Sequence, residues 1–560
     1  MVEEKVEDSK TTEEWLKQAE ELVPLAATKI ESVKSFRGKW KNISAKIDQL
    51  PSKLSDLASH PCFTKNSLCK EQLQAVVVSL QETIKLAADC TEDKYGGKLQ
   101  MQSNLDALAA KLDLNLHDCG LLVKTGVLGE ATLALTVTRS ASGAKREAIR
   151  WNIRELLARL QIGHMESKHK ALDSLVEMIN EDEKNILAVA GRSNVCALVQ
   201  LLSASSPRIR EKSAMVICCL AEAENCEQLL VSEGVLPPLI RLLESGSPLA
   251  KEKATLSLKC LTVSAETARS VVGHGGIPAL IEICQLGSTS AVTQTAAAGA
   301  LRNLSAVPEV RQCLAEEGII SVMINLLDSG ASSLSKEYAA DCLQYLTSGN
   351  ESLRRTVVSE GGIQHLLKYL DSSQPQEAAV GALRNLTASV NAEALITLGL
   401  LPRLVKVLRG GSLIAQQAAA STICRISTST DVRKLVGESG CIPSLVNMLE
   451  AKANIAQELA AQALASLLQV PQNCREIRKE EKSIPSLVQL LDPINQNTAK
   501  KYAIQALSAL ATSKKCKKLM ISCGARAYLK KLAELEVLGA KKLLERLEKS
   551  KFRGLLFGRK

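Results

Sequence analysis

Aromatic side chains are scarce in this sequence of 560 residues: Trp, Tyr and Phe make up 2% of it, whereas hydrophobic residues make up 46%. Its core must therefore be built from Leu, Ile, Val and Ala, of which Leu and Ala are strong helix formers. An all-β protein would need many more Tyr, Phe, Trp and Thr residues. The composition predicts an all-α fold, and the length predicts several domains or an elongated array of repeats.

Long apolar runs and a secretory signal are absent as well. The N-terminal segment MVEEKVEDSK is charged, and the most apolar stretch, residues 120–138, carries Lys124 and Glu130. Both features argue against export or a membrane span. The 17 cysteines include no C-x-x-C pair. In an apolar segment that is predicted to be helical, a free cysteine behaves as a small buried hydrophobic residue. We therefore expect a reduced, soluble, cytoplasmic protein, with the nucleus or a peripheral position at membranes as further locations.

Catalytic and metal-binding motifs are missing too. The six histidines form no H-x-x-x-H or H-E-x-x-H pair, and the chain has no G-x-x-x-x-G-K-[ST] loop, no G-x-S-x-G elbow and no kinase signature. His164 and His169 are five residues apart, a spacing that does not place them on one helix face. We expect no enzymatic activity, no cofactor and no metal site.

A phrase that begins with Gly and runs into an apolar helix is repeated along the chain at intervals of 38 to 43 residues. Its Gly lies at positions 234, 275, 318, 361, 399, 440 and 524, with Lys482 in one intervening copy and with earlier copies at Ser193 and Trp151. A Gly at this point permits a left-handed turn between two helices. Units this short can bury their apolar faces only by stacking on their neighbours.

The period, the Gly-x-x-Pro-x-Leu opening and the phrase GALRNL, which occurs at 299–304 and at 381–386, resemble armadillo repeats. The resemblance covers residues 148–532 and implies nine repeats in an all-α, right-handed superhelix. We expect a helical N-terminal domain over residues 1–147 before these repeats. After them we expect a partial repeat or cap helix with a basic tail over residues 533–560.

The N-terminal segment has apolar residues at three- and four-residue spacing, which indicates amphipathic helices. Thr11 or Thr12, ahead of Glu13 and Glu14, is a suitable helix start. The segments SFRGKW, QLPSKLSDL and PCFTKNSLCKEQLQ resemble the helical domain at the front of plant U-box armadillo proteins. Those ligases carry a U-box between this domain and the repeats, and we see no room for one here. The resemblance therefore implies a scaffold role and not ligase activity.

In armadillo folds the third helix of each repeat lines a concave groove, and its Asn often binds the backbone of an extended peptide. The equivalent positions here are Glu177, Cys219, Cys260, Asn303, Tyr345, Asn385, Arg425, Ser466 and Ala509. No Trp stands four residues before any of them, so the signature of nuclear import receptors is absent. The row Asn303, Tyr345, Asn385 and Arg425 is our candidate protein-binding groove, since amides, a ring and a cation suit a peptide or a loop. In the alternative interpretation, the asparagines cross-link neighbouring third helices and the arginines before them bridge adjacent repeats.

Positive charge is concentrated at the C-terminal end. The formal net charge is +10, and residues 513–560 contain fifteen Lys or Arg residues against four Asp or Glu residues, so the remaining chain is close to neutral. We consider three roles for this end: a polar cap for the last repeat, a contact with an anionic membrane surface, and a nuclear import signal.

These observations predict a non-catalytic protein–protein interaction scaffold that binds partners through the concave groove, in plant signalling or ubiquitin-linked regulation. The resemblance implies protein partners such as receptor-like kinases or ubiquitin-pathway proteins, and neither a small-molecule substrate nor nucleic acid. Two alternatives stay open. One is a ubiquitin-ligase component that acts in trans with a U-box partner, and the other is a membrane-peripheral anchor that uses the basic C-terminus.

Overall fold

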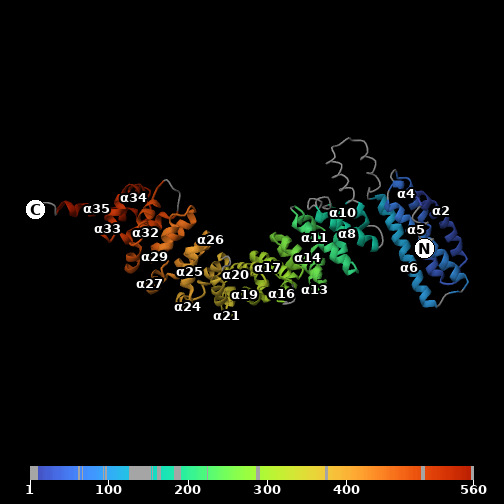
Figure 1. Ribbon diagram of the computed structural model, residues 1–560, viewed down its shortest axis with the longest axis horizontal. Helices are drawn as coiled ribbons and strands as arrows, with labels where there is room; N and C mark the ends of the chain where they lie inside the picture. The colour runs from blue at the N-terminus through green and yellow to red at the C-terminus, as the bar shows by residue number, and fades with distance from the viewer. Residues whose placement is uncertain are drawn as a thin grey trace, which may run out of the picture. The chain divides into compact units, whose positions relative to one another are not determined.

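The computed structural model describes residues 10–60, 63–65, 67–92, 94, 97–124, 153, 155–160, 165–181, 191–223, 225–285, 290–372, 376–493 and 498–556. Throughout these ranges every regular element is a helix (Figure 1), so the all-α prediction is confirmed. Packing divides the chain into two compact units, residues 1–242 and residues 243–560. Trp151, one end of the predicted repeat series, lies outside the described residues.

The first unit begins with a bundle of helices that bury a shared apolar core. Its elements are α2 (Thr12–Glu31), α3 (Arg37–Ile47), α4 (Leu50–Ala58), η1 (Phe63–Lys65), α5 (Ser67–Thr91) and α6 (Lys98–Lys124). Helix α2 packs along α5, and α6 packs against α3, α4 and α5. The unit continues with α8 (Met165–Glu181), α10 (Arg192–Leu201), α11 (Pro207–Glu222), α12 (Glu227–Ser232) and the greater part of α13 (Leu236–Ser245).

The start of α2 follows from its first residues. Thr11 Oγ1 accepts a hydrogen bond from Glu14 N at 3.2 Å, and Glu14 Oε2 accepts one from Thr11 N at 2.7 Å. This reciprocal cap satisfies two N–H groups and stabilises the helix by about 1 kcal/mol. Behind it, Trp15 of α2 is 4% exposed and Trp40 of α3 is 2% exposed. The N-terminal segment therefore folds as a helical bundle (α2–α6), as its apolar spacing predicts.

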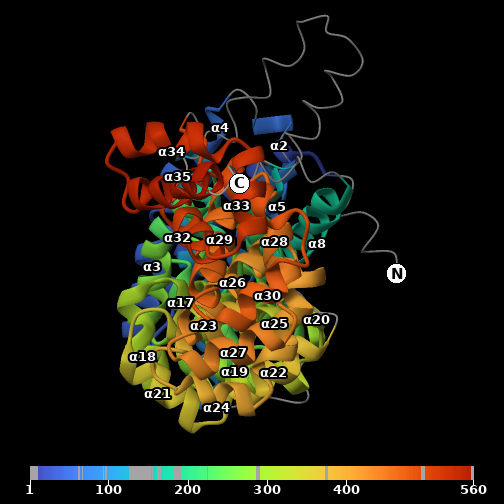
Figure 2. The same cartoon turned by 90° about the vertical axis from the view of Figure 1, so that its left-hand side faces the viewer.

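The second unit is a series of three-helix repeats (Figures 1 and 2). The first helices are α15 (Ala265–Gly273), α18 (Arg311–Glu316, after the short helix η3, Pro308–Val310), α21 (Glu351–Ser359), α24 (Ala392–Thr397), α27 (Thr430–Glu438), α30 (Pro471–Ile477) and α33 (Lys514–Ser522). The second helices are α16 (Gly276–Gln285), α19 (Ile319–Ser329), α22 (Gly362–Asp371), α25 (Leu400–Gly410), α28 (Ile442–Met448), α31 (Ser483–Gln489) and α34 (Ala525–Glu534). The third helices are α14 (Pro248–Leu261), α17 (Ala291–Ala306), α20 (Ser333–Thr347), α23 (Glu377–Leu386), α26 (Leu413–Ile426), α29 (Asn454–Leu467), α32 (Lys500–Leu510) and, last, α35 (Ala540–Leu556).

The turn between the first and second helices depends on the repeated glycine. The seven glycines of the repeated phrase all have φ between 75° and 87°, a left-handed conformation that a side chain disfavours. Lys482 stands at the same point of the series and keeps a right-handed backbone, with φ of −76°. The repeat series therefore tolerates a turn of a different shape at Lys482, while the seven glycine turns match the expectation from the sequence. The predicted copy at Ser193 has no left-handed turn, because this residue lies within α10 and the preceding Gly191 has a φ of −95°.

Successive third helices pack directly on one another from α14 to α32, and Figure 2 shows α23, α26 and α29 following in order. Small side chains permit this close approach; in α17, Ala296, Ala297 and Ala298 are all buried. Cys284 of α16 and Cys342 of α20 are also buried, and burial raises the pKa of each thiol to about 12. These cysteines therefore act as small core residues, as expected.

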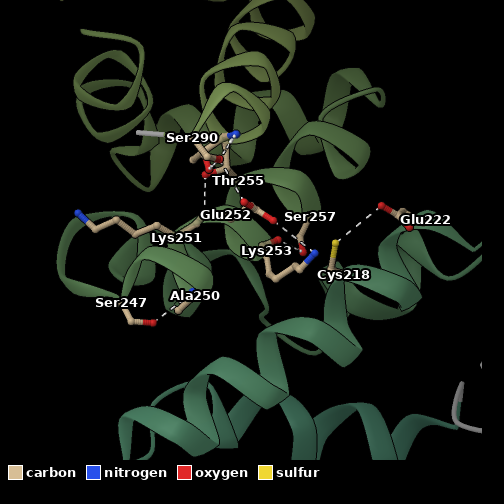
Figure 3. Close-up of polar contacts among 11 residues, drawn as sticks. Cys218, Glu222, Ser247, Ala250, Lys251, Glu252, Lys253, Thr255, Ser257 and Ser290 are labelled. Atoms are coloured by element: carbon tan, nitrogen blue, oxygen red, sulfur yellow. Dashed lines mark hydrogen bonds and ion pairs between the residues drawn. The ribbon is translucent and has the colours of Figure 1, made fainter. Parts of the chain in front are cut away.

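A polar link joins the start of one third helix to the preceding third helix. Ser290 caps α17, and its Oγ donates to Glu252 Oε2 of α14 at 3.1 Å (Figure 3). The same link recurs in the pairs Ser412–Glu377 and Thr498–Glu458. A hydroxyl and a carboxylate at these repeated positions fix the register of neighbouring repeats.

The last helix, α35, takes the place of a third helix in the final repeat. It packs against α34 and α32. Arg546 Nη1 donates to Ser508 O at 3.3 Å, and Arg526 Nη2 donates to Leu547 O at 3.0 Å. This packing favours the cap among the three roles predicted for the basic end.

Candidate protein-binding surface

The four residues of the candidate groove lie on four successive third helices of the second unit. Asn303 is on α17, Tyr345 on α20, Asn385 on α23 and Arg425 on α26, and each of these helices packs on the next. Arg425 is exposed, Asn303 and Tyr345 are partly exposed, and Asn385 is buried, with 8% exposure. The structure therefore arranges them as one row, here called the third-helix row, but exposes them unequally.

Both asparagines use their side-chain amides to join neighbouring third helices. Asn303 Nδ2 donates to Lys259 O at 3.0 Å and to Thr262 Oγ1 at 3.3 Å. Asn385 Nδ2 makes the two equivalent hydrogen bonds to α20, at 3.1 and 3.2 Å. Because an amide group has two N–H donors, these bonds leave neither asparagine a donor for a peptide backbone. They favour the cross-linking interpretation, and a ligand contact by these amides stays a prediction.

Gly299 and Gly381 stand four residues before the two asparagines and leave room for a side chain from the preceding helix. A methyl group at Gly299 would lie 3.3 Å from Cγ and Cδ of Lys259, and 3.0 Å from Cε2 of Tyr338 on the following helix. One at Gly381 would lie 2.5 Å from Nε2 and 2.7 Å from Cδ of Gln344. The asparagines bond to the carbonyl groups of Lys259 and Gln344. The phrase GALRNL thus produces the same junction at two places in the chain. Its Gly leaves room for a side chain of the preceding helix, and its Asn binds the backbone carbonyl of that same residue.

Between α17 and α20, an arginine finds its partners inside the chain. Arg302 Nε donates to Asp341 Oδ2 at 3.1 Å, and its Cζ lies 5.8 Å from the centroid of the Tyr345 ring, within range of a cation–π contact. Burial raises the pKa of Asp341, although Arg302 opposes the shift. Arg302, Asp341 and Tyr345 are called the closed junction, because the cation has both a carboxylate and a ring in the next repeat.

Between α23 and α26, the equivalent positions carry different residues. Arg384 takes the place of the arginine, Ser421 that of the carboxylate and Arg425 that of the ring. The Arg384 side chain donates from Nη2 to Asn385 Oδ1 at 3.4 Å. Burial lowers the pKa of Arg384, and the positive charge of Arg425 lowers it further. In the described part of the chain neither arginine forms an ion pair, so Arg384, Ser421 and Arg425 are called the open junction.

Carboxylates collect on the N-terminal half of α20 and beside it. Burial raises the pKa of Glu337, and the charges of Asp341 and Glu377 raise it further. The same three carboxylates raise the pKa of Tyr369, after the larger effect of burial, and the buried Tyr369 Oη has no hydrogen-bond partner among the described residues. The surface is therefore acidic around α20 and basic around α26.

Arg425 is among the site residues predicted from the sequence, whereas Arg384 and Ser421 are not. The available signal was the absence of an acidic residue four positions before Arg425, where the equivalent position on α20 carries Asp341.

Residues 264–306, which span α15–α17, match the family described as Armadillo/beta-catenin-like repeat. The chain therefore contains an armadillo repeat. Residues 17–127 of this armadillo-repeat protein, which cover most of the α2–α6 bundle, match a second family, described as Domain of unknown function (DUF7032). The repeat match confirms the predicted armadillo solenoid.

Known relatives of this armadillo-repeat protein match it in part. U-box domain-containing protein 8 of Arabidopsis thaliana is 28% identical over 180 residues, which is 31% of this chain and 47% of the relative. Plakophilin-4 of Mus musculus is 25% identical over 193 residues, 32% of this chain and 16% of the relative. The crystal structure of an engineered protein aligns with 71% of this chain and 99% of its own, at 26% identity and a TM-score of 0.62. The chain thus spans less than half the length of these two curated relatives.

Two features of the described residues bear on metal binding and on membrane insertion. No group of three or more His, Cys, Asp or Glu residues in that part of the chain could hold a metal ion. No helix there is both long enough and apolar enough to cross a membrane.

Proposed function

We propose that this armadillo-repeat protein is a non-catalytic scaffold that binds protein partners along the third-helix row. The observation that carries the proposal is the arrangement of Tyr345 and Arg425 on packed helices, the first partly exposed and the second exposed. Aromatic and Arg side chains dominate the energy of protein interfaces. Helix packing holds neighbouring repeats about 8–10 Å apart, so a partner meets a rigid surface.

Within the row, the residues have different roles. Asn303 and Asn385 set the spacing, because their amides bind the preceding helix. Tyr345 and Arg425 contact the partner. The ring of Tyr345 supplies apolar area, and the exposed guanidinium of Arg425 supplies charge and directional hydrogen bonds.

The U-box relative supports partners in ubiquitin-linked regulation in plants, and receptor-like kinases are a second partner class that we propose, for a protein of the cytoplasm or nucleus. The same relative supports a second candidate function, a ubiquitin-ligase component acting in trans. A reconstituted ubiquitination assay tests it. Ubiquitin transfer that requires both this chain and a purified U-box protein is expected if the trans role is correct, and equal transfer without this chain would contradict it.

The scaffold function is tested by quantitative affinity capture from plant extract, followed by binding assays with each purified candidate partner. The test variant combines Tyr345→Ala and Arg425→Gln. The matched control combines Tyr528→Ala on α34 and Arg409→Gln on α25, which makes the same two changes on second helices. Circular dichroism establishes that both variants are folded.

We expect direct partners to lose binding to the row variant and to keep binding to the control. Partners that bind both variants as well as wild type would contradict the proposal and would direct attention to the α2–α6 bundle or to the basic end. Equal loss in both variants would show a nonspecific effect of removing surface charge and area.

A further inference from the structure

The stacking of third helices brings a fixed set of positions together at every junction. The residue just before the row position, such as Arg302, faces two positions of the next repeat, occupied at the closed junction by Asp341 and Tyr345. The asparagines show the same alignment at α14–α17 and at α20–α23. Asn303 donates to Lys259 O and Asn385 donates to Gln344 O, and each of these carbonyl groups belongs to the residue just before the row position of the preceding repeat. The alignment is therefore a property of the repeat.

The open junction has the same alignment, but among the described residues neither of its arginines forms an ion pair. By this alignment, Ser421 and Arg425 take the places opposite Arg384, whose Nη2 donates to Asn385 Oδ1 at 3.4 Å. Arg425 is exposed and Arg384 is partly buried. Two like charges on adjacent packed helices repel each other, and partial burial strengthens that repulsion. A bound anion would remove it.

We infer that the open junction is an anion-binding site that takes a carboxylate or phosphate group of a partner protein. The inference rests on the proposed function, because it assigns chemistry to one point of the third-helix row. Two guanidinium groups offer planar forks of N–H donors that match these anions in a bidentate manner. The hydroxyl of Ser421, which lies where Asp341 lies at the closed junction, supplies a further donor.

The carboxylates near the open junction favour a partner with a single anionic group over a long polyanion. Glu337 and Asp341 lie on α20, the third helix that precedes α23, and Glu377 is the first residue of α23, where its charge acts on both of them. A nucleic acid strand or a uniformly acidic segment that extended along the row would meet these carboxylates. A partner segment with one acidic or phosphorylated residue at α23–α26 avoids that repulsion.

The test measures fluorescence anisotropy of labelled peptides with the full chain at low and at raised salt. The probes are a short peptide with one phosphoserine, its glutamate version and its unmodified serine version. The test variants are Arg425→Gln and Ser421→Asp. The second supplies an internal carboxylate, as Asp341 does at the closed junction. The control is Arg409→Gln, which removes an exposed arginine from the second helix α25.

We expect the phosphoserine or glutamate peptide to bind more tightly than the serine peptide. Both test variants should lose at least about tenfold in affinity for it, since charge-assisted bidentate hydrogen bonds are lost or blocked, and the control should not. The preferred peptide identifies the source of the anion as phosphorylated or acidic. Neither test variant should be less thermally stable than wild type, because each reduces repulsion at the junction.

Equal affinity for the three peptides, or equal affinity of wild type and both test variants for the anionic peptide, would overturn the inference. A further variant reverses the charge of the lysines on α33. If this variant lost affinity for the anionic peptide while Ser421→Asp kept it, the inference would also be overturned, because the anion would then bind at the basic end. These outcomes are separate from failure of the proposed function, since partner capture that depends on Tyr345 can survive the loss of this anion site.

Discussion

The closed and open junctions occupy equivalent places in two repeats that share the phrase GALRNL, yet only one of their two arginines has an ion-pair partner among the described residues. Arg302 has a carboxylate partner and a ring partner within the chain. Arg384 has in the same places a hydroxyl and a second cation. The difference teaches that the backbone of a repeat protein fixes where side chains meet. Substitution at two facing positions then decides whether the arginine is paired within the chain or is available to a partner.

The features common to both junctions are the ones that stabilise the stack. Asn303 and Asn385 each donate two hydrogen bonds to the preceding third helix, and Gly299 and Gly381 each leave space for a neighbouring side chain. These residues would be misread as binding residues from their position in the row alone. Removing the shared features should therefore reduce stability, whereas exchanging the facing residues should alter binding.

The largest expected effect is that of Asn385→Ala. The substitution removes two hydrogen bonds and leaves the partly buried carbonyl of Gln344 without this partner, which should lower the free energy of unfolding by about 1–3 kcal/mol. Guanidinium unfolding and hydrogen exchange of α20 and α23 measure the loss. Asn325→Ala, on the exposed surface of α19, is the control and should change stability little. Equal stability of the two variants would show that the asparagine does not join the helices.

A smaller effect is expected from closing the open junction. Ser421→Asp places a carboxylate beside Arg384 and Arg425, and it should raise the free energy of unfolding by up to about 1 kcal/mol, the value of a partly exposed ion pair. Denaturant unfolding of wild type and variant measures this gain. Ser421→Asn has a similar size without the charge and should give no gain. A variant with Asp that is less stable than the one with Asn would contradict the described pairing.

The converse exchange opens the closed junction. The double substitution Asp341→Ser with Tyr345→Arg gives α17–α20 the residues of α23–α26, and it should add a second binding equivalent for the anionic probe peptide. Its affinity should be lower than at the original site, because Glu337 and Glu377 stay nearby. Titration to saturation gives the stoichiometry. An unchanged stoichiometry would show that the facing residues alone do not create the site.

The smallest effect concerns the acidic side of the closed junction. The folded-state pKa of Glu337 is raised above its ordinary value of 4.5, so its protonated form contributes stability that is present below that value and is lost as the pH rises through the folded-state pKa. Glu337→Gln removes the titration and should reduce the pH dependence of unfolding in this interval by less than about 1 kcal/mol. Unfolding curves at several pH values measure it, with Glu316→Gln on exposed α18 as control. An unaltered pH profile in Glu337→Gln would contradict the shift.

Much of the architecture was readable from the sequence, because it depends on local chemistry with a long period. The glycine turns, the three-helix units and the start of α2 at Thr11 all follow from residues that are close together in sequence. Lys482 shows the limit of such reasoning. The phrase lacks its glycine there, and packing of the neighbouring helices keeps the repeat in series with a right-handed backbone.

The candidate site was readable only in part. The sequence predicts which residues share the row, and the structure confirms that they lie on successive packed helices. The sequence does not state which positions of two neighbouring third helices face each other, because this alignment is set by how closely the Ala-rich helices approach. For this reason Arg302 and Arg384 look alike in sequence. The lack of a carboxylate at position 421 can be read from the sequence, but it can be related to Arg384 only when α23 and α26 are stacked.

The most direct test of the third-helix row as the partner-binding surface is site-specific photocrosslinking in plant extract. A photoreactive amino acid replaces Tyr345 or Arg425 in the row, or Arg409 on a second helix as control, and crosslinked proteins are identified by mass spectrometry. We expect the same partner to be captured from positions 345 and 425 and not from position 409. Capture of partners from position 409 with none from the two row positions would contradict the proposed function.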